Sequence, residues 1–110
     1  MEHSVHVQPN GHIVSFSGEI DLENSPAART RLLEVVEYAT TVFVDLTAVT
    51  YMDSSGIASL VEAYQRAKKT NVAFVLISTS PAVLRVLQMA RLDKVFTIHE
   101  TLEHAQHAKH

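Results

Sequence analysis

The sequence predicts one α/β domain over residues 1–110, with a mostly parallel five-stranded sheet, an antiparallel N-terminal strand and flanking helices. Its 110 residues are a common size for a single domain. Apolar residues make up 46% of the chain against 19% charged residues, which is enough to build a core. Short β-branched segments alternate with segments of helical periodicity, and this alternation indicates parallel strands joined by helical crossovers.

The first two strands are predicted to form an antiparallel hairpin. Residues 5–8 are a short strand candidate, the turn signature Pro-Asn-Gly follows at 9–11, and residues 13–16 form the second strand. A helix is then expected with Ser25 as its N-cap and Pro26 as its first helical residue, because the missing N–H of proline costs nothing at that position.

The middle of the chain predicts a central strand and a long helix. Residues 42–46 are mostly apolar on both alternating faces, which favours a parallel strand covered on both sides. We expect a loop over residues 47–56, then a helix with apolar residues at helical spacing over 57–67 and Lys68–Lys69 in its last turn. Asn71 can take the left-handed conformation at the helix exit.

The last third predicts two more strands and two more helices. Residues 72–77 are the most hydrophobic strand candidate, and Ser80 and Pro81 repeat the pattern of a cap followed by proline. Residues 95–98 are predicted as the last strand, and the polar segment 98–110 as a C-terminal helix or tail, helical over 102–108. The inward face of the third helix is expected to consist of Val83, Leu84, Leu87 and Ala90.

Composition and charge disfavour several classes of function. Nine basic and twelve acidic residues give a net charge of −3, so no nucleic-acid binding is expected. The longest apolar run, residues 72–77, is far shorter than the roughly 20 residues of a membrane helix, so no direct membrane insertion is expected. The chain has no cysteine, which excludes disulfides and thiolate chemistry and favours a cytoplasmic location.

The segment Asp53-Ser54-Ser55-Gly56 is the strongest candidate for chemistry. It lies between a predicted parallel strand and its helix, and ligand sites in such sheets lie beyond the carboxyl ends of the strands. The N–H groups at a helix N-terminus are receptive to phosphate. The same side chains are also good helix caps, so this motif alone leaves both interpretations open.

Residues 42–57, VFVDLTAVTYMDSSGI, resemble the signature stretch of STAS domains, the family of anti-sigma factor antagonists. The resemblance extends to GEID at 18–21, VLRVL at 83–87 and LDKVF at 92–96, and so covers essentially the whole chain. It implies a sheet whose strands follow the order of the sequence. The sequence departs from the family at positions 71 and 91, where asparagine and arginine stand in place of a frequent glycine.

The resemblance also implies a function. In antagonists of this type the second hydroxyl of the motif is phosphorylated, and that role falls on Ser55, with Ser54 as the reserve candidate and the expected cap. The implied partners are an anti-sigma factor with serine kinase activity, bound in the unphosphorylated state, and a PP2C-type phosphatase. The alternative is a non-phosphorylated STAS subunit of an ABC-type lipid transporter, or a signalling scaffold. In the transporter branch the second hydroxyl tends to be missing.

A partner-binding surface is expected where two loops meet. The loops after the second and third strands emerge at the same edge of a sequentially ordered parallel sheet. Asp21 and Glu23 would present acidic groups there, and Met52 and Ile57 an apolar centre, although Asp21 can instead serve only to fix its turn. The complete set expected to bind a partner is Asp21, Glu23, Asp53, Ser54, Ser55, Gly56 and Ile57.

Enzymatic and metal-binding functions find little support in the sequence. No Gly-x-Ser-x-Gly elbow is present, so we expect no enzyme and no catalytic residue. His104, His107 and His110 are spaced by three, and on a helix these steps keep the three side chains from converging on one ion. Asp21, Asp45 and Asp53 have ordinary structural explanations, so no metal or other cofactor is expected.

Overall fold

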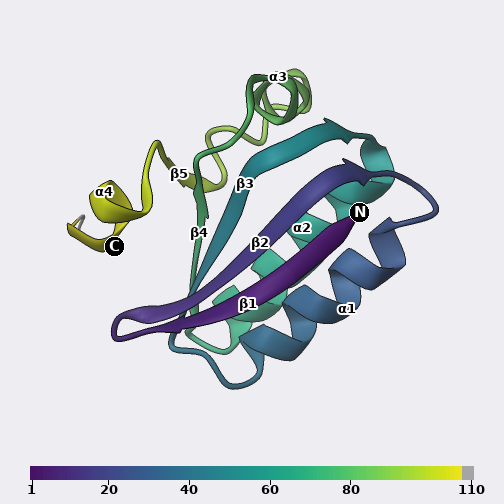
Figure 1. The fold of residues 1–110 in the computed structure, drawn as a ribbon. Coiled ribbons are helices and arrows are strands. Elements are labelled where there is room, and N and C mark those ends of the chain that lie inside the picture. Colours follow the sequence, from purple (N-terminus) through teal and green to yellow (C-terminus); the bar gives the residue numbers. More distant parts are fainter. Residues whose placement is uncertain (108–110) are drawn as a thin grey trace.

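The computed structural model describes residues 1–107 and confirms the predicted fold class (Figure 1). The sheet order is β1-β2-β3-β4-β5, with β1 antiparallel to β2 and the other neighbours parallel. The elements are β1 (Glu2–Gln8), β2 (Gly11–Ile20), α1 (Ser25–Val36), β3 (Thr41–Met52), α2 (Ser54–Lys69), β4 (Ala73–Ile77), α3 (Pro81–Met89), β5 (Thr97–His99) and α4 (Leu102–His107).

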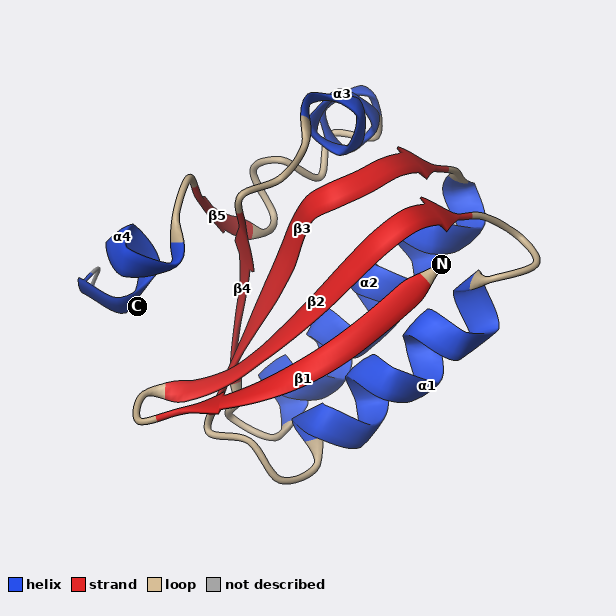
Figure 2. Cartoon of the chain, viewed as in Figure 1, coloured by secondary structure: helices blue, strands red, loops and turns tan. Residues whose placement is uncertain are grey.

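The sheet separates a large core from a small one. Helices α1 and α2 lie together on one face (Figure 2), and the large core fills the space beneath them. The small core lies on the other face, where Ala105 of α4 packs with Ile13, Phe43, Val75 and Ile77. The central strand is therefore covered on both faces where its apolar run predicts it. The side chains that are most completely buried include Val14, Leu32, Val35, Val44, Leu46, Leu60, Leu76 and Leu87.

Strand β3 is longer than its apolar run predicts, and the loop expected over residues 47–56 is wrong. The strand continues to Met52, paired with β2, through register shifts between Ser15 and Ser17 and between Gly18 and Glu19. These irregularities insert extra residues into β3. Its buried positions Leu46, Val49 and Met52 are consequently three residues apart, which hides the period of two by which a strand is recognised.

The start of α1 also differs from the prediction. The N-cap is Asn24, without a side-chain cap bond, and Pro26 occupies the first turn as expected. Ser25 is 7% exposed and lies inside the helix, where its carbonyl accepts a hydrogen bond from the Ser59 hydroxyl. Asp21 supplies the turn before the helix instead, because its carbonyl accepts the Ser25 N–H at 2.7 Å.

The helix exits explain the two departures from the family pattern. Asn71 and Arg91 have φ angles of 61° and 60°, the left-handed conformation that glycine adopts most easily. The prediction for Asn71 is confirmed, and Arg91 adopts the same conformation although its side chain disfavours it.

The last third of the chain agrees in order and differs at its boundaries. The Ser80 hydroxyl accepts the Val83 N–H, so the predicted cap of α3 is confirmed. Ala90 is exposed rather than inward-facing, because α3 ends at Met89. Strand β5 begins at Thr97, two residues later than predicted. The predicted C-terminal helix is present to His107, and the rest of it lies outside the described residues. Within residues 1–107 no helix is both long and apolar enough to cross a membrane.

Candidate functional site

The candidate site is the junction at which β3 ends and α2 begins. Asp53 is the N-cap of α2, and its Oδ1 accepts the backbone N–H of Ser55 at 3.0 Å and of Gly56 at 3.2 Å. Its carbonyl accepts the Ile57 N–H at 3.0 Å. One residue thus satisfies three donors of the first turn. The expectation that Ser54 is the cap is wrong, because the aspartate one residue earlier fills that role.

The Ser55 hydroxyl is bound to the same carboxylate oxygen. Its Oγ donates to Asp53 Oδ1 at 2.5 Å, while the Ser55 side chain remains half-buried and Ser54 is exposed. The pKa of Asp53 is lowered below its ordinary value of 3.8, chiefly by this hydroxyl. Desolvation opposes the shift as the second-largest effect, and the backbone N–H groups of Gly56, Ser55 and Leu22 each lower the pKa further. Near neutral pH the site therefore contains an ionised carboxylate beside the proposed phosphate acceptor.

The loop after β2 lies against this junction, as the sheet order predicts. The Asp53 N–H donates to the carbonyl of Ile20, the last residue of β2, at 3.4 Å. Asp21 Oδ1 accepts the Asn24 N–H at 3.0 Å, so Asp21 does fix its turn. The two loops therefore share one surface. Asp21 helps to build that surface by fixing the turn of the first loop.

Gly56 allows the close approach between α2 and the end of β2. A Cβ atom at this position would lie 2.6 Å from the Ile20 carbonyl oxygen and 2.6 Å from Met52 Cγ. Real side chains essentially never come so close, so only glycine fits while both neighbours keep their places. Gly56 is itself buried and acts by positioning the first turn of α2.

The apolar centre expected from Met52 and Ile57 is not present at the surface. Both side chains are buried, with exposed fractions of 2% and 8%. Two other apolar side chains near the junction are exposed instead, Leu22 at 77% and Tyr51 at 49%. The sequence does not predict their exposure, because Leu22 stands alone in a polar turn and Tyr51 lies in a stretch whose pattern predicts a loop.

The expectation that free helix N–H groups would receive a phosphate also needs correction. The N–H groups of Ser55, Gly56 and Ile57 already donate to Asp53. A phosphate on Ser55 would therefore compete with the side chain of Asp53 for these donors instead of finding them vacant.

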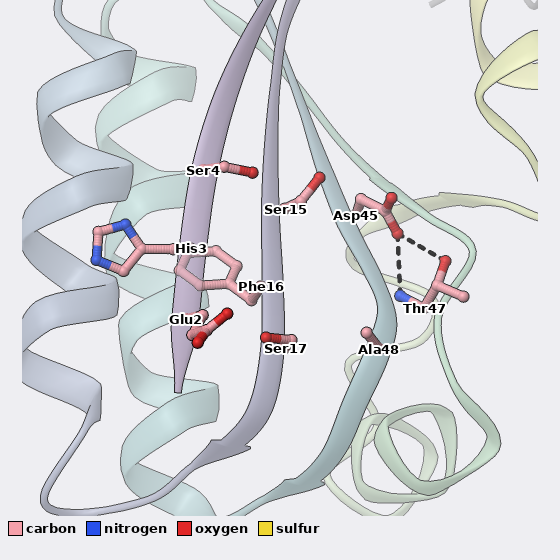
Figure 3. Close-up of a pocket in the computed structure, with 9 residues that line it drawn as sticks. All are labelled: Glu2, His3, Ser4, Ser15, Phe16, Ser17, Asp45, Thr47 and Ala48. Carbon is pink, nitrogen blue, oxygen red and sulfur yellow. Dashed lines mark hydrogen bonds between the residues drawn. The ribbon is translucent and has the colours of Figure 1, made fainter.

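The other polar features lie apart from this junction. Within residues 1–107 no three His, Cys, Asp or Glu side chains are grouped to hold a metal ion, and His110 lies outside that range. Asp45 accepts hydrogen bonds from the N–H and hydroxyl of Thr47 (Figure 3). It forms no metal-binding group with Asp21 and Asp53 among the described residues. Asp45 and Thr47 border a shallow cavity of about 230 Å³ on the face of the sheet opposite α1 and α2. On this face Ser4, Ser15 and Asp45 stand in one row across β1, β2 and β3.

The fold and the site define a STAS domain. The family model of the STAS domain matches residues 3–105, and the chain belongs to this family. Two relatives of this chain are named anti-sigma factor antagonists. The chain is 28% identical over 85 residues to the anti-sigma-B factor antagonist of Bacillus subtilis, covering 77% of this chain and 78% of that protein. It is 30% identical over 94 residues to the anti-sigma-F factor antagonist RsfB of Mycobacterium tuberculosis, covering 84% and 76%.

A solved structure agrees with these sequence relatives. The crystal structure of an anti-sigma factor antagonist from Mycobacterium paratuberculosis superposes on this chain with a TM-score of 0.86 at 30% identity. The match covers 94% of this chain and 89% of that one, so the likeness extends over the whole domain.

Proposed function

We propose that this chain is an anti-sigma factor antagonist whose partner binding is switched by phosphorylation of Ser55. The unphosphorylated chain binds an anti-sigma factor with serine kinase activity and thereby releases the sigma factor. Phosphorylation ends this binding, and a PP2C-type phosphatase restores it. On this proposal the chain is a cytoplasmic binding protein that performs no catalysis of its own.

The observation that carries the choice of Ser55 over Ser54 is the bond between the Ser55 hydroxyl and the Asp53 carboxylate. This bond holds the Ser55 oxygen in one place at the start of α2. Ser54 is exposed in the same turn and remains the reserve acceptor.

The charges at the junction supply a physical reason for the switch. A phosphoserine adds about −1.5 to −2 charges and three strong acceptor oxygens. It also removes the hydroxyl proton that now bridges Ser55 and Asp53. The phosphate would therefore stand beside the ionised Asp53 carboxylate, and the hydrogen bond from the Ser55 hydroxyl to that carboxylate would be lost. An interface that tolerates the neutral serine would have to desolvate two adjacent anions after phosphorylation.

The proposed partner surface surrounds Ser55 and includes Asp21, Glu23, Asp53 and Ser54. Glu23 is exposed and Asp21 and Asp53 are half-buried, so this surface is acidic and suits a basic face on the partner. Exposed Leu22 adds the apolar contact that the sequence alone assigned to other residues. Gly56 and Ile57 belong to the set by placing the first turn of α2.

A transporter subunit or signalling scaffold with the same fold would bind its partner without phosphorylation. The presence of both hydroxyls, with that of Ser55 held by Asp53, favours the phosphorylated switch over this alternative.

Treatment of the full chain with the candidate kinase and ATP tests the proposal directly. Tandem mass spectrometry should place one phosphate on Ser55, Ser55→Ala should abolish it, and the matched variant Ser54→Ala should retain it. Phosphate on Ser54 alone would contradict the assignment, and no phosphate with any kinase that binds the chain would favour the non-phosphorylated alternative.

A further inference from the structure

Strand β1 forms the long free edge of the sheet. It pairs with β2 without interruption from Glu2 opposite Ser17 to Gln8 opposite Gly11, and within residues 1–107 no strand pairs with its other side (Figure 2). The opposite edge, β5, spans only three residues. A regular edge of seven residues presents unpaired backbone N–H and C=O groups along its length.

This edge lacks the features by which proteins usually prevent strands from pairing between molecules. Such features are short length, bulges, proline and above all lysine. Residues 3–8 contain no proline and no charged residue with histidine neutral, and the first lysine or arginine of the chain is Arg29. Val7 is 75% exposed on this strand. The edge is therefore open to another strand.

The sequence of β1 is complementary to itself when two copies run antiparallel. With a two-fold axis at Val5, His3 stands opposite Val7 of the second copy, Ser4 opposite His6, and Glu2 opposite Gln8. On one face of the sheet the contact then pairs His3, Val5 and Val7, which are mostly apolar. On the other face it pairs the hydrogen-bonding side chains Glu2, Ser4, His6 and Gln8. No two carboxylates face each other, since Glu2 is the only acidic residue of the strand.

We propose that two copies of this chain associate through their β1 edges to form a continuous ten-stranded antiparallel-centred sheet. The occupant of the edge is a second copy, because the register centred on Val5 pairs all seven residues and sets the one acidic residue of each strand, Glu2, opposite the neutral Gln8 of the other. A shift by two residues in either direction shortens the ladder to five pairs, and in one direction it places His6 opposite His6. An isologous two-fold contact of this kind closes at the dimer.

The association is independent of the proposed phosphorylation. Ser55 lies at the end of β3 and the start of α2, and β3 is separated from β1 by β2. Failure of the dimer would therefore leave the proposed function untouched, and failure of the switch would leave the dimer untouched.

Sedimentation equilibrium of the full chain over a concentration series tests the proposal. The wild-type chain should reach twice its mass of 12.2 kDa. Ser4→Glu combined with His6→Glu places two like-charged pairs across the two-fold axis and should raise the dimer dissociation constant about tenfold. Ser4→Glu combined with His6→Lys changes the same exposed positions but places opposite charges together, and should restore the wild-type constant to within about threefold.

A third variant guards against a folding artefact. Val7→Lys introduces one lysine on the free edge and should also weaken the dimer, whereas Val95→Lys, at a position 48% exposed away from this edge, should not. Far-UV circular dichroism should be unchanged in all four variants. A monomer at every concentration of wild-type chain would overturn the proposal. An equal constant for the two double variants, or for the two lysine variants, would also overturn it.

Discussion

Replacing Gly56 with alanine separates two effects that oppose each other. Gly56 lies in the first turn of α2, and in an unconstrained helix alanine is more stable than glycine by about 0.5–1 kcal/mol. The added Cβ would, however, lie 2.6 Å from the Ile20 carbonyl oxygen, against at least 3.4 Å for an ordinary contact. Because Met52 Cγ is equally close on another side, the helix start has to move by several tenths of an ångström.

The size of the overlap decides the sign of the effect. Forcing an extra carbon into a packed site costs typically about 1–3 kcal/mol, and here one of the two opposing atoms is a strand carbonyl that cannot rotate away. We therefore expect Gly56→Ala to lower the free energy of unfolding by about 1–2 kcal/mol, a fall in melting temperature of roughly 4–8 °C per kcal/mol. Urea unfolding with a constant m-value measures this directly.

A second substitution in the same helix calibrates the helix-propensity contribution. Ala58 is exposed in α2, so Ala58→Gly should cost about 0.5–1 kcal/mol through propensity alone and leave Ser55 in place. Gly56→Ala should in addition lower the rate of Ser55 phosphorylation, since the first turn has moved, whereas Ala58→Gly should not. A stability gain for Gly56→Ala equal to the loss for Ala58→Gly would refute the close-approach argument.

Four further predictions concern the charges and the apolar contact around the site. Ser55→Ala should keep partner binding but make it unswitchable, and Ser55→Asp should weaken it by about 1–3 kcal/mol in calorimetry, with equal affinities arguing against an interface here. Because the pKa of Asp53 is lowered in the folded chain, the ionised carboxylate stabilises the fold fully above pH 3.8, and this stabilisation is lost as the pH falls further. In unfolding titrations Asp53→Asn should keep the cap but lack this loss of stability in acid. Asp53→Ala should lower the stability at all pH values. Leu22→Ser should weaken partner binding by about 1–2 kcal/mol without changing the melting temperature, whereas Met89→Ser, at a similarly exposed position of α3, should leave both the binding and the melting temperature unchanged. Asp21→Lys should lower the melting temperature because the turn bond to Asn24 is lost. If Asp21→Asn also loses affinity for the partner, the charge of Asp21 contributes to binding, and if its affinity is unchanged, Asp21 does not belong to the partner surface.

The order of elements follows from the sequence because local signals decide it. Ser80 before Pro81 and the left-handed Asn71 are features of single turns, and both are found in the structure. The boundary of β3 depends instead on pairing with β2 through inserted residues, which no period of the β3 sequence reveals. The start of α1 was misplaced for a similar reason, since Asp21 takes over the turn and leaves Ser25 free to be buried against α2.

The meeting of the loops after β2 and β3 is predicted correctly from the sequence, but the contacts of single residues at this junction are not. The motif and the sheet order bring the two loops together, which needs only topology. The rotation of α2 about its axis relative to β2 decides which side-chain oxygen caps the helix. It also decides whether Ile57 points outward. That rotation is set by the close contact of Gly56 with Ile20. Exposure of Leu22 likewise depends on the turn that precedes α1 and could not be deduced from its residue type.

In the structure Asp53 both caps α2 and binds the hydroxyl that the proposed function phosphorylates. The aspartate caps α2 through Ser55 and Gly56 N–H groups and accepts the Ser55 hydroxyl on the same Oδ1. Ser54 contributes to neither bond, and Gly56 lets the capped turn sit against β2. On the proposed function, a phosphate on Ser55 is added to the one hydroxyl that shares its acceptor with the helix cap. On this proposal the switch acts beside the residue that orders the start of α2 and whose N–H donates to Ile20 at the end of β2, so the added charge lies next to both loops of the surface.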